Sequence, residues 1–74
     1  MNNTTTAPSP AAIALAIEAL AIEGYAIGDT IPTNGGYSRE TIVAAWYSRG
    51  AIRVTTEAWG GHQYTRDLYD VLAS

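Results

Sequence analysis

Cysteine and lysine are absent from this chain, and His62 is its one histidine. Without cysteine the protein can form no disulfide, and it has no thiolate to act as a nucleophile or a metal ligand. Zinc is usually held by several Cys and His side chains, so a single histidine argues against a zinc site. We therefore predict no metal and no cofactor.

Basic charge is also scarce. Four arginines oppose seven acidic residues, which gives a net charge of −3, and residues 1–37 hold no basic residue. Proteins that bind nucleic acid usually concentrate Lys and Arg on one face. Four dispersed arginines do not give that pattern, so nucleic acid is not an expected partner.

Long hydrophobic runs are missing too. The apolar stretch within residues 10–24 covers about 14 residues, whereas a membrane-spanning helix needs about 20. The first ten residues, MNNTTTAPSP, carry no positive charge ahead of that stretch, unlike an export signal. A secreted domain of this size would usually also carry disulfides. We expect a cytoplasmic protein that does not enter a membrane.

The chain of 74 residues is long enough for one small domain. Residues 1–8 are polar, rich in threonine and end at Pro8, which predicts a disordered tail. Residues 9–74 then form the single domain. Its first predicted element is a helix over residues 10–23, because Ser9 is a typical N-cap, Pro10 suits the first helical position and Gly24 suits the C-terminal end.

This predicted helix is apolar on nearly every side. At 100° per residue, Ile13, Ile17 and Leu20 form one stripe, which we expect to face the core. Leu15 and Ile22 lie roughly opposite that stripe. Their cover could be another segment of this chain, a second copy in a homodimer through helix 10–23, or a partner protein, and the sequence leaves all three open.

A second helix is predicted over residues 39–49. Ser38 would be its N-cap and Gly50 its terminating glycine. Ile42 and Trp46 would share its buried face, together with Val43.

The segment between the two predicted helices, residues 25–38, is rich in turn formers such as Pro32. We predict mostly loop there. Three apolar residues suggest one short strand: Tyr25, Ile27 and Ile31.

Residues 51–59 alternate in polarity, which predicts a half-buried strand. Gly60-Gly61 is a hairpin signal, so residues 62–64 should return as a partner strand. A final helix with Thr65 as its N-cap follows, and a continued strand is the alternative. The predicted fold is a small α+β domain in the order helix, loop or short strand, helix, β-hairpin, helix.

No group of residues points to catalysis. His62 lies beside the hairpin turn, where a solvated histidine is ordinary. Asp67 and Asp70 are three residues apart in the last predicted helix, but the sequence gives no sign of the burial that tunes a carboxylate pair for acid–base work. The loop TNGGYS lacks the lysine and the spacing of a phosphate-binding loop. We predict no enzymatic activity.

The aromatic residues are more informative. The chain has five tyrosines, two tryptophans and no phenylalanine, and Tyr, Trp and Arg dominate the hot spots of protein interfaces. Trp59, beside the two glycines, is the aromatic residue that we most expect to be exposed. The predicted partner-binding residues are Tyr37, Arg49, Arg53, Trp59 and Tyr64, with Leu15 and Ile22 of the first helix.

Small size, acidic charge, missing catalytic groups and this aromatic content indicate a protein-binding module that acts by contact alone. In size and composition the chain resembles the anti-CRISPR proteins, small inhibitors that phages encode against bacterial defence complexes. The resemblance implies a bacterial host complex as the partner.

Two other functions remain open. The chain could be an accessory subunit or oligomerising domain of a larger assembly, docked through the first helix. It could also be a winged-helix-like DNA-binding regulator that reads DNA with helix 39–49, with Arg39 near the helix start. The charge balance argues against this second alternative.

Overall fold

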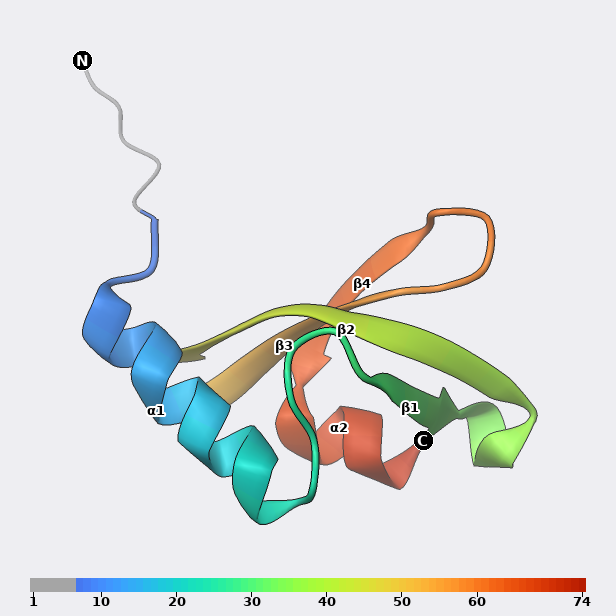
Figure 1. Cartoon of the computed structure of the whole chain (residues 1–74), viewed down its shortest axis with the longest axis horizontal. Helices are drawn as coiled ribbons and strands as arrows, with labels where there is room; N and C mark the ends of the chain where they lie inside the picture. Colours follow the sequence, from blue (N-terminus) through green and yellow to red (C-terminus); the bar gives the residue numbers. More distant parts are fainter. Residues whose placement is uncertain (1–6) are drawn as a thin grey trace.

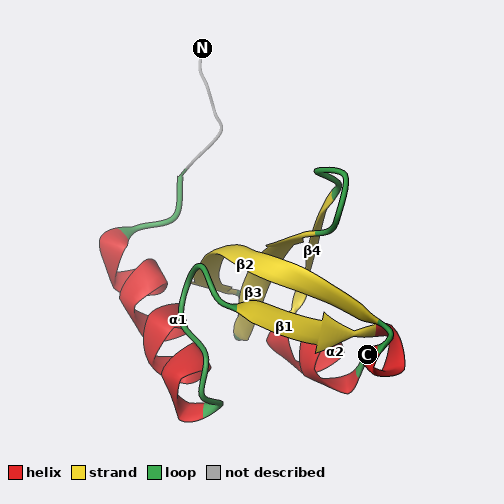
Figure 2. Ribbon diagram, turned by 45° about the vertical axis from the view of Figure 1, so that its right-hand side comes forward, coloured by secondary structure: helices red, strands yellow, loops and turns green. Residues whose placement is uncertain are grey.

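The computed structural model describes residues 7–74. A four-stranded antiparallel sheet forms one layer, and two helices cover one face of it (Figures 1 and 2). In chain order the elements are α1 (Pro10–Ile22), β1 (Thr30–Thr33), the 3-10 turn η1 (Asn34–Gly36), β2 (Ser38–Ser48), β3 (Ala51–Glu57), β4 (Gln63–Asp67) and α2 (Leu68–Ala73). The strands lie side by side in sequence order. We call the face covered by the helices the inner face.

The predicted α+β class is confirmed, but the order of elements differs from the prediction. One helix is followed by four consecutive strands and a second, short helix. Of the predicted disordered tail, residues 1–6 lie outside the described residues.

Helix α1 is confirmed to within one residue of its predicted end. The Ser9 side chain accepts a hydrogen bond of 3.1 Å from the backbone N–H of Ala12, so it is the N-cap. At the other end, the N–H of Gly24 donates to the carbonyl of Ala21 and the N–H of Tyr25 to that of Leu20. These bonds satisfy carbonyls that the helix itself leaves free.

The buried face of α1 is not the predicted one. Ala16 and Leu20 are fully buried, whereas Ile13 and Ile17 of the predicted core stripe are exposed. At 100° per residue, Ala16 lies about 40° from Leu20, on the side away from the two isoleucines. The contact is therefore centred on an alanine face, whose small side chains let α1 approach β2 closely.

The opposite side of α1 has no cover from the rest of the domain. Leu15 is 51% exposed and Ile22 is 82% exposed. Of the three covers considered for this stripe, a segment within residues 7–74 is excluded.

The predicted helix over residues 39–49 is wrong, because this segment is strand β2 and Ser38 is its first residue. A β-bulge between Ile42 and Ala44 accounts for the error. It places the next buried side chain of β2 at Ala45, three residues after Ile42 instead of two. A spacing of three is also typical of one face of a helix.

The turn after β2 explains the glycine that was expected to end a helix. Ser48 pairs with Ala51, so Arg49 and Gly50 form a two-residue turn. Their φ angles are +53° and +82°, as a tight hairpin of this kind requires. Gly50 therefore belongs to a hairpin, where it adopts a positive φ without strain.

Trp46 is not part of the core. It pairs with Arg53 directly beside the buried pair of Ala45 and Val54. Since neighbouring residues of a strand point to opposite faces, Trp46 lies half-buried on the outer face of the sheet.

Strand β3 and its hairpin are confirmed. Val54 and Thr56 are fully buried, as the alternation predicts. Glu57 pairs with Gln63 across the hairpin. The connecting loop, residues 58–62, is longer than the predicted two-residue turn.

The boundary between the last strand and the last helix differs from the prediction. Strand β4 continues to Asp67, three residues beyond the predicted return strand, and α2 begins only at Leu68. Thr65 is not an N-cap, because it lies within β4, where its hydroxyl is 2.9 Å from that of Thr55. The predicted short strand before β2 is β1, and of its three expected residues only Ile31 lies in it.

The core lies between the inner face and both helices. Its buried apolar residues are Ala16, Leu20, Ile31, Ile42, Ala45, Val54 and Val71. The helices thus contribute three of these seven side chains, and the strands contribute four.

Candidate functional site

Four polar side chains, one from each strand, meet on the inner face at the end of the sheet nearest η1. We call them the polar cluster: Thr33, Glu40, Thr56 and Arg66. The Glu40 carboxylate is its centre. One oxygen, Oε1, accepts from Thr56 Oγ1 at 2.6 Å and from Arg66 Nη2 at 2.5 Å, and the other, Oε2, accepts from Thr33 Oγ1 at 3.2 Å.

These contacts keep Glu40 ionised. Burial by itself would raise the pKa of this carboxyl. The hydrogen bond from Thr56, the positive charge of Arg66 and the bond from Thr33 together outweigh burial and hold the pKa of Glu40 below its ordinary value. The cluster therefore contains a stable ion pair at the edge of the core.

Arg66 connects the polar cluster to the surface. Its guanidinium lies over the ring of Tyr64, with 5.4 Å from Cζ to the ring centroid, within the range of a cation–π contact. Its Nη2 also donates to Thr56 at 3.0 Å. Its Nε is buried without a hydrogen-bond partner within residues 7–74, although the side chain as a whole is 30% exposed.

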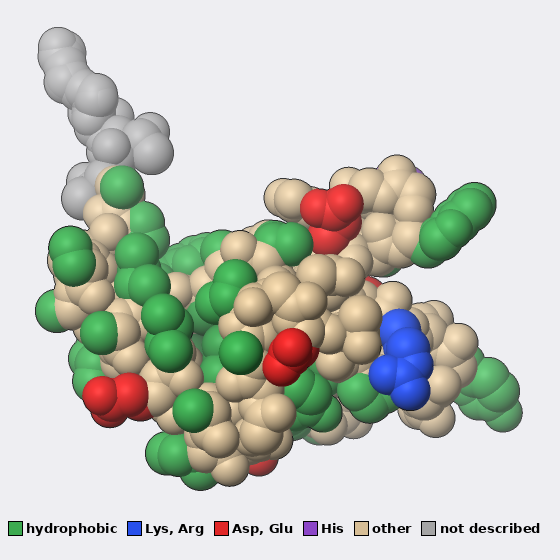
Figure 3. All heavy atoms as spheres, in the orientation of Figure 1, with side chains coloured by type: hydrophobic (Ala, Val, Ile, Leu, Met, Phe, Trp, Pro, Cys, Tyr) green, Lys and Arg blue, Asp and Glu red, His purple; other side chains and the backbone are tan. Residues whose placement is uncertain are grey.

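A shallow pocket of about 520 Å³ opens beside the polar cluster. We call it the aromatic–arginine pocket, and its lining residues are Tyr37, Ser38, Arg39, Glu40, Ala58, Trp59, Tyr64 and Arg66. The start of β2 supplies one wall, and the β3–β4 hairpin supplies the other. Figure 1 shows η1 and this hairpin loop projecting at the same end of the sheet, and Figure 3 shows a notch between them.

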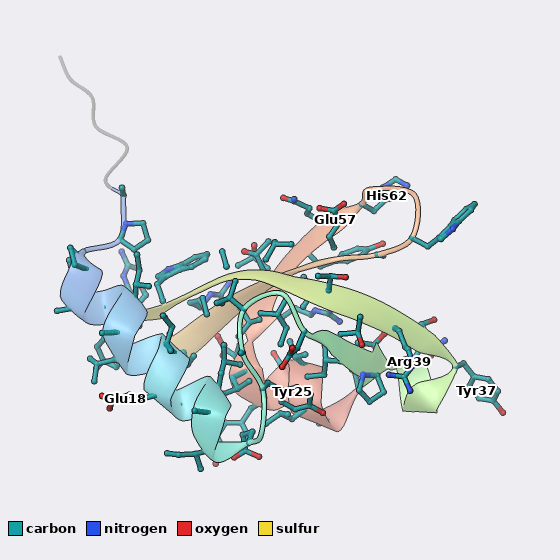
Figure 4. All side chains as sticks on the ribbon, in the orientation of Figure 1. Glu18, Tyr25, Tyr37, Arg39, Glu57 and His62 are labelled. Carbon is teal, nitrogen blue, oxygen red and sulfur yellow. The ribbon has the colours of Figure 1, made fainter. Side chains whose placement is uncertain are left out.

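The pocket brings together three of the predicted partner-binding residues: Tyr37, Trp59 and Tyr64. Tyr37 is 92% exposed and Trp59 is 95% exposed, so neither ring is needed to fill the core. Tyr37 points out from the end of the sheet where β2 begins, near Arg39 (Figure 4). The expectation that Trp59 is exposed is confirmed.

Two predicted arginines lie elsewhere. Arg53, on the outer face, forms an ion pair of 2.6 Å with Asp67. Arg49 lies in the β2–β3 turn at the opposite end of β2, and both arginines line a separate shallow depression. The structure therefore does not join them to the aromatic residues.

The remaining two predicted residues, Leu15 and Ile22, belong to α1, over which hydrophobic side chains spread in Figure 3. Ile22 borders an open depression of about 370 Å³ between α1 and α2. We call it the apolar groove, and its lining residues are Ala19, Ile22, Glu23, Gly50, Ala51, Ile52, Asp67, Leu68, Tyr69 and Leu72. Leu15 is not among them.

The sequence did not identify the polar cluster, and it pointed to Arg39 only as a DNA-reading residue of the predicted helix 39–49. Arg39 and Glu40 fell within the predicted helix 39–49, because β2 was not recognised as a strand. Once residues 38–48 are read as a strand, the spacing of Glu40 and Ile42 puts the carboxylate on the inner face. No sequence signal identified Arg66 as its partner.

Residues 7–74 also bear on metal binding, acid–base chemistry and membrane insertion. Within residues 7–74 no three His, Asp or Glu side chains are grouped so that they could hold a metal ion. Asp67, one of the two carboxylates considered for acid–base work, is paired with Arg53 instead. None of the helices over the same residues is long and apolar enough to cross a membrane.

The geometry of the pocket is thus a rim of exposed aromatic rings around arginine donors. Comparison of the chain with protein-family models, with curated proteins and with solved structures gave no match.

Proposed function

We propose that this protein is a non-enzymatic binding module that holds a protein partner in the aromatic–arginine pocket. The observation that carries the proposal is the exposure of Tyr37 and Trp59 on two separate hairpins that line one pocket. Exposed aromatic rings that cluster around arginine are typical of interface hot spots.

The hydrogen bonds beneath the pocket favour recognition by a surface that is already formed before the partner binds. Tyr64 and Arg66 are adjacent in the lining, and Arg66 is fixed by Glu40 and Thr56. A site whose donors are already held in place loses less entropy on binding. The two outer rings, Tyr37 and Trp59, would then provide apolar area that becomes buried only in the complex.

For the class of partner, we propose a bacterial defence complex that the protein inhibits by contact, as phage-encoded anti-CRISPR proteins do. Small size, acidic charge and the content of Tyr, Trp and Arg are what support this narrower proposal. It places the protein in the host cytoplasm.

A pull-down from a bacterial lysate tests the proposal. The bait is the full chain, compared with a Tyr37→Ala/Trp59→Ala double variant and with Tyr69→Ala. Tyr69 is a matched control because it is 87% exposed but lines the apolar groove instead. We expect a specific protein captured by the wild type, retained by Tyr69→Ala and lost by the double variant.

Circular dichroism must show that all three proteins are folded. Equal capture by the wild type and the double variant would show that the pocket does not bind the partner. Capture lost only with Tyr69→Ala would move the binding surface to the apolar groove.

A second candidate function is an accessory or self-associating subunit, and the exposed Leu15 and Ile22 of α1 favour it. Sedimentation of the wild type over a range of concentrations tests this possibility. The DNA-binding alternative has lost its main support, because residues 39–48 of the proposed reading helix lie in strand β2 and Arg49 lies in the turn that follows.

A further inference from the structure

We infer that the aromatic–arginine pocket recognises a carboxylate in an acidic segment of the partner protein, held by Arg39 and Arg66 with its flanking side chains against the aromatic rings. This inference deepens the proposed function and depends on it. It names the chemistry of the partner, which the proposed function leaves open.

The hydrogen-bonding groups in the pocket favour a ligand that accepts. Glu40, its one carboxylate, already accepts three bonds, from Thr33, Thr56 and Arg66. Arg39 has no ion pair within residues 7–74. The charged groups of the pocket therefore offer free donors but no free carboxylate, so a ligand that accepts hydrogen bonds complements them.

Arg66 adds to this surplus of donors. Its Nη2 is used by Glu40 and Thr56, but its Nε has no hydrogen-bond partner within the described part of the chain. A buried donor without a partner costs free energy. Nε has no exposed surface, so a ligand oxygen can meet this guanidinium only at the exposed part of a side chain that is 30% exposed.

The local charge of the pocket also favours a carboxylate. Two arginines and one glutamate line the pocket, so its net charge is 2 − 1 = +1, in a chain whose net charge is −3. A carboxylate complements this local charge, and charge-assisted bonds between arginine and carboxylate are among the stronger hydrogen bonds in proteins.

The charge of the whole chain favours an acidic protein segment over a polyanion. The negative charge of the rest of the chain opposes the close approach of a nucleic acid, whose affinity depends on many phosphate contacts. A segment with one carboxylate needs only the charge of the pocket. Tyr37, Trp59 and Tyr64 can then contact the apolar side chains on either side of it.

Nuclear magnetic resonance with two matched peptides tests the inference. The probes are acetyl-Gly-Leu-Glu-Leu-Gly-amide and the same peptide with glutamine in place of glutamate. The indole N–H signal of Trp59 reports on binding. We expect this signal to shift with the glutamate peptide. The affinity measured from the shift should be about fivefold weaker for the glutamine peptide.

Two variants locate the contact. Arg39→Gln should lower the affinity for the glutamate peptide to the affinity that the wild type has for the glutamine peptide. Arg49→Gln changes the same charge at the other end of β2 and should leave binding unchanged. Equal affinity for the two peptides, no shift with either at millimolar concentration, or a shift with oligo-thymidine alone would each overturn the inference.

The pull-down then distinguishes this inference from the proposed function. If the captured protein is lost with Tyr37→Ala/Trp59→Ala but fully retained with Arg39→Gln, the pocket binds protein and the carboxylate assignment is wrong. If the double variant has no effect, the proposed function itself fails.

Discussion

The two ends of the inner face are built from opposite kinds of side chain. Under α1, Leu20, Ala45 and Val54 are buried among apolar neighbours. Near η1, the polar cluster fills the corresponding position with an ion pair and two hydroxyl groups. The apolar end is held together by area removed from water, and the polar end by a small number of directional bonds.

The difference extends to the surfaces. The apolar end leads to the exposed side of α1 and the apolar groove, and the polar end leads to the aromatic–arginine pocket. Exposed apolar side chains occur at both ends, but Leu15 and Ile22 belong to a core helix, whereas Trp59 belongs to a hairpin loop. Changes at the two ends should therefore affect stability to different degrees.

The largest effect is expected at the apolar end. Leu20→Ala should lower the free energy of unfolding by about 2–5 kcal/mol, because Leu20 is fully buried. Leu15→Ala on the same helix should cost less than about 1 kcal/mol, since its side chain is half exposed. Urea denaturation followed by circular dichroism measures both, and equal losses would show that the two sides of α1 are not distinct.

At the polar end, Glu40→Ala should lower the free energy of unfolding by about 2–4 kcal/mol, because it leaves the charge of Arg66 and two hydroxyl groups without their acceptor. This loss should be smaller than for a fully buried ion pair, because Arg66 is partly exposed and water screens its charge. Glu57→Ala is the control, since Glu57 accepts only from exposed Gln63. A loss no greater than the control's would show that the polar cluster does not stabilise the fold.

A fall in pH should lower the stability that the polar cluster contributes to the fold. The pKa of Glu40 lies below its ordinary value of 4.5 in the folded protein, so the fold favours the ionised form. This contribution to stability is complete above the ordinary pKa and is lost as the pH falls through the folded pKa. Unfolding free energies measured from pH 7 to pH 3 should fall less steeply for Glu40→Gln than for the wild type, and parallel curves would contradict the assignment.

The double variant Leu15→Gln/Ile22→Gln tests the surface of the apolar end. Both side chains are exposed and glutamine is a good helix former, so the variant should keep its circular dichroism spectrum and lose no more than about 1 kcal/mol of stability. If a second copy or a partner covers this stripe, association should disappear in sedimentation or pull-down. Unfolding of the monomer would instead show that the stripe supports the core.

The smallest effect on stability is expected for the pocket rim. Tyr37→Ala and Trp59→Ala should change the free energy of unfolding by less than about 0.5 kcal/mol each, because both rings are almost fully exposed. Thermal unfolding measures this directly. A clear loss of stability in either variant would mean that the aromatic rim serves the fold and would weaken its proposed role in binding.

The sequence predicts an element well where its signal is local. Ser9 and Pro10 mark the start of α1, and the alternation of β3 with two following glycines marks its hairpin. β2 was missed because its bulge breaks the alternation after Ile42. The run Thr41-Ile42-Val43 with Trp46 and Tyr47 is rich in β-branched and aromatic residues, which is typical of a strand.

Part of the candidate site was predictable, because some of its residues carry local signals. Tyr37, Trp59 and Tyr64 were identified from residue type and from their neighbouring turns. Their meeting in one pocket could not be derived, because it depends on the register of β2 against β3. The pairing of Glu40 with Arg66 joins residues 26 positions apart, and no periodicity within one segment reports a contact of that range.

The polar cluster also has a consequence for the order of folding. Glu40 bonds to residues that are 7, 16 and 26 positions away in the chain, so its carboxylate can exchange its hydration shell for protein donors only after all three hairpins have closed. A shift of one residue in the register of any strand would turn the side chain that this strand contributes to the polar cluster to the outer face. We therefore expect the cluster to form after the rate-limiting step, so that Glu40→Gln speeds unfolding while leaving the refolding rate nearly unchanged.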